Sequence, residues 1–173
     1  MKIPIVYIPY TKLKKFLYIE KKYRCNRDIV PIGCDCHPAY TLQKLELRRV
    51  RLPFDWLNTD PIKGLVFVIK NTENNFKYFL HNLKKNEDGH IISEKFPYTE
   101  FIHEKDIISS SSDRAKLVRS IELFNAIVTY PIIYLYNLSS HSLNNEIALK
   151  KFYNSIIDLK KIMMDSQTLC IYI

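Results

Sequence analysis

Residues 32–40 read Ile-Gly-Cys-Asp-Cys-His-Pro-Ala-Tyr, and this short segment joins two elements of different kinds. The apolar run Ile29–Gly33 ends at a glycine, which is typical of a buried strand. Pro38 suits the first turn of a helix, where the missing N–H of proline costs nothing, and Ala39–Arg48 carries apolar residues at helical spacing. The segment therefore predicts a strand, a tight turn over 34–37 and a helix.

Cys36 lies at or near the start of this predicted helix. The free N–H groups and the dipole of a helix N-terminus favour an anion, so they stabilise a thiolate and make it nucleophilic. A nucleophilic thiol also needs a base within hydrogen-bond reach, and spacing alone does not choose one of the five histidines. These are His37, His81, His90, His103 and His141. A cysteine at a helix start is more often structural than catalytic, so the local pattern leaves both roles open.

The C-terminal half of the chain alternates between helical and extended patterns. A helical stripe over 117–128 precedes the apolar run Ile132–Tyr136, and a second over 147–163 precedes the strand Leu169–Ile173. Strands that alternate with helices pair in parallel through crossover connections. We therefore predict an α/β fold with a mixed sheet flanked by helices and βαβ units in the C-terminal half.

The middle of the chain predicts shorter elements. Asp60-Pro61 is a helix start, and that helix runs to about Lys70. The i, i+3, i+4, i+7 spacing of apolar residues from Phe76 to Leu83 predicts a second helix. Two extended stretches follow around Pro97, and the second covers Tyr98–His103.

The charge of the chain is concentrated in its first third. Residues 1–51 hold 12 Lys and Arg against 4 Asp and Glu, whereas residues 52–173 hold 14 of each. We interpret residues 1–28 as a basic N-terminal extension, with a helix over Thr11–Lys22, and 29–173 as the main domain. The basic third indicates either an acidic partner such as nucleic acid or a solvated Lys- and Arg-rich helix face.

Composition limits the class of protein. Apolar residues make up 47% and charged residues 25%, which is close to the globular average and excludes general disorder. No apolar run approaches the roughly 20 residues of a membrane-spanning helix, and lysines at 12, 14 and 15 follow the first apolar run too closely for a signal peptide. We therefore expect a cytoplasmic protein without a membrane span, with its four cysteines as free thiols.

Two motifs together resemble a known family. Ile32–Tyr40 is followed by Leu42 and Leu45, and then by Pro-Phe-Asp-Trp-Leu at 53–57. This order is similar to a family of predicted papain-like cysteine peptidases, which has a Gly-x-x-Cys opening, a helix and a Pro-Phe-Asp-Trp signature. Later elements also match, including Phe101-Ile102-His103-Glu104. The resemblance covers roughly residues 29–173.

The resemblance implies a role for each matching residue. Cys36 takes the position of the nucleophile, His103 that of the base, and Asp55 of the signature orients the histidine. Asp106 and Asn137 are the alternatives to Asp55 on position alone, because Asp106 is close to His103 in the sequence and Asn137 follows a predicted strand. It implies a hydrolase or acyl transferase that acts on a peptide or another amide-bearing substrate without a cofactor, and an α+β papain-like fold as the alternative architecture. Two features depart from the family: Glu104 where aspartate is commoner, and Tyr-Asn at 136–137 where arginine is often found.

Other interpretations of the same residues stay open. Asp55 can tie loops together within a buried aromatic cluster, and His103 can be a hydrogen-bonded core histidine. Cys34, Cys36 and His37 with His103 could bind zinc, although Cys-x-Cys-His lacks the usual cysteine pair spacing. The whole domain could also be a binding module without catalysis, whose basic N-terminal third binds nucleic acid or another acidic partner.

Overall fold

The computed structural model describes residues 2–7, 14–18, 23–104, 106–138 and 140–173. Its β-strands are β1 (Lys2–Tyr7), β2 (Lys14–Tyr18), β3 (Asp28–Pro31), β4 (Asn58–Thr59), β5 (Leu83–Lys85), β6 (Ile91–Ser93), β7 (Phe96–Glu100), β8 (Ile132–Asn137) and β9 (Thr168–Tyr172). Its helices are α1 (His37–Lys44), α2 (Gly64–Glu73), α3 (Ser111–Ile127), the short 3-10 helix η1 (Ser140–Leu143) and α4 (Glu146–Ile162). Within these described ranges, no helix combines the length and the apolar character needed to cross a membrane.

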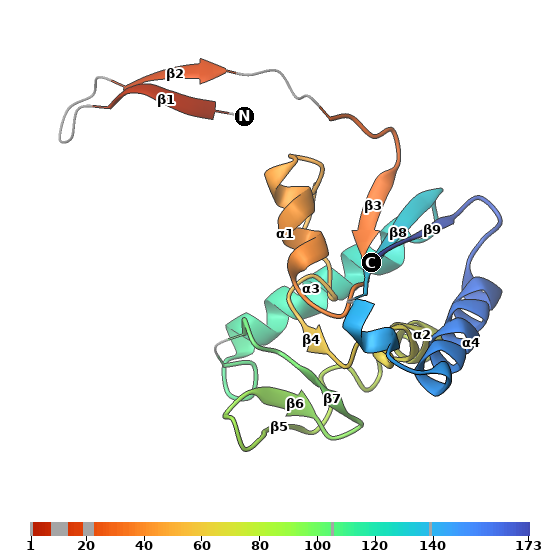
Figure 1. Cartoon of the computed structure of the whole chain (residues 1–173). Helices are drawn as coiled ribbons and strands as arrows, with labels where there is room; N and C mark the ends of the chain where they lie inside the picture. Colours follow the sequence, from red (N-terminus) through yellow and green to blue (C-terminus); the bar gives the residue numbers. More distant parts are fainter. Residues whose placement is uncertain (1, 8–13, 19–22, 105, 139) are drawn as a thin grey trace.

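A parallel sheet with strand order β3-β8-β9 carries the C-terminal half of the fold (Figure 1). Ile29 is in register with Ile133, and Leu135 with Cys170. The inward residues of β8 are buried because the α4 crossover covers this sheet, and parallel strands need such cover. The predicted α/β class is thus confirmed, and β8, α4 and β9 form a βαβ unit in the C-terminal half.

Four antiparallel strands form a separate sheet with strand order β4-β7-β6-β5. In Figure 1 the two sheets lie at different ends of the molecule, and α3 runs from one towards the other. Asn58 is in register with Glu100 and Thr59 with Thr99, so the short strand β4 is the edge of this sheet. The second extended stretch was predicted over Tyr98–His103, but the strand β7 ends at Glu100 and His103 lies in the turn that follows.

An aromatic cluster joins these layers. Phe54, which is 1% exposed, has its ring centroid 5.3 Å from that of Phe124, 5.6 Å from Phe76 and 5.8 Å from Phe67. Most of these pairs meet edge to face, which is the favoured geometry for aromatic rings. The Pro-Phe-Asp-Trp segment is therefore anchored in the core by its phenylalanine.

Two of the predicted helices are wrong. Residues 76–82 form turns and bends and Leu83 begins β5, because Asn75, Phe76 and Asn82 have positive φ angles of 52°, 59° and 47°, which a right-handed helix excludes. In the N-terminal segment Lys14–Tyr18 is strand β2, which pairs with β1 in an antiparallel hairpin and satisfies its backbone groups there. The rest of the predicted helix over 11–22 lies outside the described residues.

Candidate active site

Cys36 is the N-cap residue of α1 and is partly exposed. The N–H of Tyr40 donates to its carbonyl at 2.9 Å, so the thiol stands at the first turn of the helix as the sequence predicted. Gly33 fixes this turn against the sheet, since a Cβ there would lie only 2.7 Å from Cγ of Pro38. Among the described hydrogen bonds, none uses the N–H of Cys36 or of Ala39, so both donors are available to an anion.

Asp35 connects this turn to the neighbouring strand. Its carboxylate accepts from the N–H of His37 at 2.9 Å and lies 3.0 Å from Nδ1 of the same residue. It also accepts from Nδ2 of Asn137 at 3.3 Å. Asn137, an alternative third member of the catalytic group, is therefore bound to the Cys36 turn and not to His103.

Cys34 faces inward. Its Sγ donates to the carbonyl of Asn137 at 3.3 Å, and its side chain is 5% exposed. Burial, reinforced by the nearby charge of Asp35, raises the pKa of Cys34 to about 11. The thiol therefore stays protonated and serves packing, which leaves Cys36 as the accessible cysteine of the motif.

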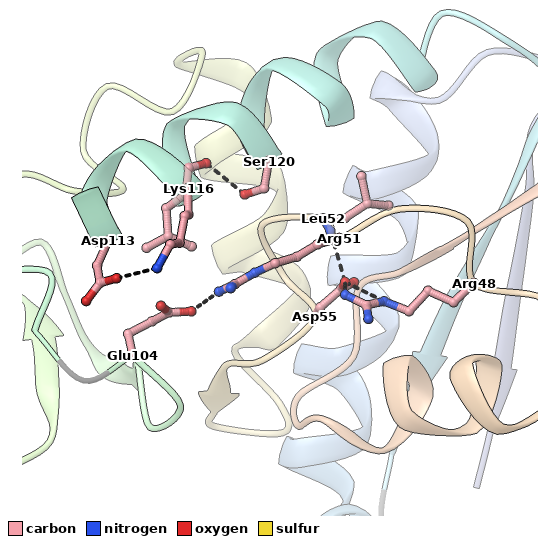
Figure 2. A network of polar contacts seen from close by, with 9 residues as sticks. Arg48, Arg51, Leu52, Asp55, Glu104, Asp113, Lys116 and Ser120 are labelled. Carbon is pink, nitrogen blue, oxygen red and sulfur yellow. Dashed lines mark hydrogen bonds and ion pairs between the residues drawn. The ribbon is translucent and has the colours of Figure 1, made fainter. Parts of the chain in front are cut away.

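Asp55 is fully buried and forms an ion pair (Figure 2). Its Oδ2 accepts from Nε of Arg48 at 2.9 Å, from Nη2 of Arg48 at 2.5 Å and from the N–H of Leu52 at 2.9 Å. Burial raises the pKa of Asp55, whereas the Leu52 N–H and the Arg48 guanidinium oppose that rise. Its Oδ1 has no hydrogen-bond partner among the described residues.

The end of α1 explains why Arg48 reaches Asp55. The sequence predicted a helix to Arg48, but α1 ends at Lys44 because Glu46 adopts a φ of 56° and the N–H of Leu47 bonds back to the carbonyl of Leu42 at 2.9 Å. A left-handed residue that ends a helix in this way is usually glycine, and here it is Glu46. Arg48 thus leaves the helix and turns towards the buried carboxylate.

His103 lies in an exposed turn directly after β7. The rings of His103 and Trp56 meet edge to face, with their centroids 5.5 Å apart. The guanidinium of Arg48 lies 5.2 Å from the centroid of the same Trp56 ring. No described hydrogen bond joins His103 to Asp55 or to Cys36. The structure thus brings His103 beside the Pro-Phe-Asp-Trp segment through Trp56.

Glu104 and Asp106 flank this turn. Glu104, the departure from the family pattern, forms an ion pair with Arg51 (Figure 2). Asp106, another alternative third member, accepts from the N–H of Ser109 at 3.1 Å and so closes its own loop.

Strand β4 connects the Cys36 turn to the strand that leads to His103. The N–H of Thr59 donates to the carbonyl of Cys34 at 2.6 Å. On its other side Thr59 is paired with Thr99 of β7, four residues before His103. The two segments that carry the predicted nucleophile and base therefore attach to the same two-residue strand.

A cavity of about 500 Å³ opens between these segments. It is lined by Cys34–Asp35, Asn58–Pro61, Pro97–Tyr98 and Glu100. The lining residues of 58–61 and 97–100 were not predicted as functional from the sequence, because only the pairing of β4 with β7 brings them beside the cysteine turn. The one available signal was Asp60, which was predicted only as a helix cap.

The basic residues of 48–51 are largely neutralised within the fold. Arg48 pairs with Asp55, Arg49 with Asp28 at 3.0 Å and Arg51 with Glu104. Within the described part of the chain, no three His, Cys, Asp or Glu side chains gather as a metal ion would require. The zinc interpretation therefore has no cluster to rest on among these residues.

Comparison with known proteins gives two matches. A family described as "Putative papain-like cysteine peptidase (DUF1796)" matches residues 27–165, a range that contains Cys36, Asp55 and His103. A stretch of 50 residues is 42% identical to "Uncharacterized protein R408" of Acanthamoeba polyphaga mimivirus. That stretch is 29% of this chain and 22% of the viral protein, so the chain spans about a fifth of that relative. No solved structure matches the chain.

The family match confirms the resemblance drawn from the two motifs. It extends from the residue before β3 into the segment between α4 and β9, and so includes the sheet β4-β7-β6-β5 and the strands β3 and β8 of the parallel sheet. The chain therefore belongs to the family described as "Putative papain-like cysteine peptidase (DUF1796)".

Proposed function

We propose that the protein is a cysteine hydrolase or acyl transferase in which Cys36 is the nucleophile and His103 is the general base. The observation that carries the proposal is the placement of Cys36 at the N-cap of α1, next to a cavity whose opposite wall is the strand that leads to His103. A helix N-terminus stabilises a thiolate, and a thiolate is the form of cysteine that attacks carbonyl carbon.

The reaction forms and breaks two bonds at one carbonyl. The Cys36 sulfur attacks the carbonyl carbon of an amide, isopeptide or thioester, and the oxyanion binds the free N–H groups at the start of α1. His103 takes the thiol proton and returns it to the leaving group, which departs and leaves an acyl thioester on Cys36. Water, or an acceptor amine in a transferase, then attacks the thioester and releases the thiol.

Asp55 acts as a positioning residue in this scheme. It fixes Arg48 and the turn that carries Trp56, and the Trp56 ring is the contact surface of His103. Its unpartnered Oδ1 is the acceptor that an imidazole N–H of His103 would use. A buried carboxylate beside a catalytic imidazole holds the tautomer that accepts the thiol proton.

Alkylation by iodoacetamide at pH 6.5 tests the proposal, with each of the four cysteines followed by peptide mass spectrometry. We expect Cys36 to react first, ahead of Cys170, which is more exposed and serves as the internal control. The His103→Asn substitution should slow the labelling of Cys36 and leave Cys170 unchanged. If Cys36 stays unlabelled while Cys170 reacts, the proposed nucleophile is wrong.

A specific observation also favours the binding-module function. A cavity of about 460 Å³ is lined by Tyr23, Arg24 and Arg27, which is a suitable composition for a base and a phosphate backbone. Glu46 and the paired Arg48 and Arg49 complete the charged part of its lining. Arg24→Gln should then weaken binding of a single-stranded oligonucleotide, whereas Lys150→Gln on α4 should not. Binding should fall steeply with salt, and no gel shift at low salt would rule this function out.

A further inference from the structure

The cavity beside Cys36 has an unusual set of charges for so basic a protein. Three carboxylates line it, those of Asp35, Asp60 and Glu100, and no Lys or Arg does. Among the described ion pairs, none joins these three to Lys or Arg; Asp35 has His37 and Glu100 has His90 at 3.4 Å. The chain carries a net charge of +8, so cations are abundant elsewhere.

Other buried or half-buried carboxylates of the same fold are neutralised by arginine. Asp28, Asp55 and Glu104 each pair with one residue of the 48–51 segment. The cavity is therefore lined by carboxylates that no Lys or Arg pairs with among the described ion pairs.

Two of the three carboxylates, those of Asp60 and Glu100, are oriented by neutral donors. Oδ1 of Asp60 accepts from the N–H groups of Ile62 at 2.9 Å and Lys63 at 3.0 Å. Glu100 accepts from Nδ2 of Asn58 at 3.0 Å and of Asn86 at 2.8 Å, and these bonds, together with the contact with His90, lower the pKa of Glu100. Neutral donors orient a carboxylate and keep it ionised without cancelling its charge.

The negative charge of these carboxylates changes the pKa values of neighbouring side chains. Beyond the effect of burial, Asp60 raises the pKa of Tyr98, and Asp35 and Asp60 both raise that of Cys34. Tyr98 lines the cavity, and its ring already contacts one cation of the fold, since Nζ of the exposed Lys63, which does not line the cavity, lies 5.3 Å from the ring centroid. An aromatic face and several carboxylates are the groups that recognise an ammonium or guanidinium.

We infer that this cavity binds the lysine or arginine side chain of a peptide substrate and places the neighbouring carbonyl at Cys36. The placement of the carbonyl at Cys36 rests on the proposed function, whereas the binding of the cationic side chain rests on the cavity alone. Asp35 lines the cavity and immediately precedes Cys36 in the chain, so a bound cationic residue is held next to the nucleophile. The substrate class is therefore a peptide with a lysine or arginine next to the bond that is broken.

Binding is measured on the full chain with Cys36→Ala, so that no chemistry follows. The probes are N-acetyl-arginine amide and N-acetyl-citrulline amide, which have nearly the same shape and differ by one charge. We expect the arginine probe to bind about tenfold more tightly by NMR titration, and its affinity to fall with added salt. Asp60→Asn, which keeps an oxygen for the helix start, should weaken it about two- to fivefold.

Asp88→Asn is the matched control, because it removes one exposed carboxylate that does not line the cavity. Equal binding of the two probes, no binding of the arginine probe, or the same loss with Asp88→Asn as with Asp60→Asn would overturn the inference. Iodoacetamide labelling of Cys36 is read separately on the wild-type chain. If Cys36 is not labelled but the arginine probe still binds selectively, the catalytic role is rejected and the cation site stands. If Cys36 is labelled but the two probes bind equally, the cation site is rejected and the catalytic role stands.

Discussion

The buried Arg48–Asp55 ion pair makes a prediction about stability that can be worked out from its geometry. Asp55→Asn keeps the shape of the side chain but removes the charge that faces Arg48, whose side chain is only 16% exposed. Removing one partner of a buried pair costs about 3–5 kcal/mol, because the other charge stays buried without compensation. An asparagine oxygen can still accept from the N–H of Leu52, so we expect a loss of about 3 kcal/mol, at the low end of this range.

Urea unfolding followed by circular dichroism measures this loss. A change of this size corresponds to a melting temperature lower by about 6–12 °C for a chain of this length. Glu146→Gln is the control, since its ion pair with Lys150 on α4 has side chains 76% and 72% exposed and contributes about 0.5 kcal/mol or less. If Asp55→Asn and Glu146→Gln lower the free energy of unfolding equally, Asp55 does not anchor the Pro-Phe-Asp-Trp segment as argued.

Three further substitutions or treatments test other parts of the fold. Gly33→Ala should lower the free energy of unfolding by about 1–3 kcal/mol and slow the labelling of Cys36, because the new Cβ would displace Pro38; unchanged stability and labelling would contradict the close approach. Tyr136→Phe should cost about 1–3 kcal/mol in urea unfolding, since its hydroxyl donates to the carbonyl of Pro61 at 2.6 Å, and a neutral result would show that water replaces it. Because the pKa of Cys34 is raised to about 11, its contribution to stability is full below the ordinary thiol range and is lost as the pH rises towards 11. Cys34 should therefore resist iodoacetamide at pH 9 in the folded chain and react in urea, and labelling at the same rate in both conditions would refute its burial.

The elements that sequence analysis predicted well are those with a long, regular apolar pattern. The helices α3 and α4 and the strand β8 follow from such patterns, because burial of one face fixes both the type and the position of an element. The helix over 76–83 failed although its apolar spacing was regular. Three left-handed residues turn the chain there so that Phe76 and Phe79 enter the aromatic cluster, and tertiary packing overrides helical propensity.

The candidate site divides in the same way. Cys36 was predicted correctly at the start of a helix, because glycine and proline around it determine the local backbone. The pairing of Arg48 with Asp55 was missed, since it depends on where α1 stops and on how the following loop folds back. The acidic cavity could not be predicted, because its walls come from β4 and β7, which are far apart in the sequence.

The rate of Cys36 alkylation at neutral pH tests the central claim most directly. The measurement uses a chain in which Cys25, Cys34 and Cys170 are replaced by serine, so that only one thiol reports, and circular dichroism first confirms that it folds. We expect iodoacetamide to label Cys36 about tenfold faster or more in the folded chain than in the same chain unfolded in urea, and the His103→Asn variant to lose most of this difference. A folded chain that reacts no faster than the unfolded one, or a difference that His103→Asn leaves unchanged, would contradict a catalytic pair of Cys36 and His103.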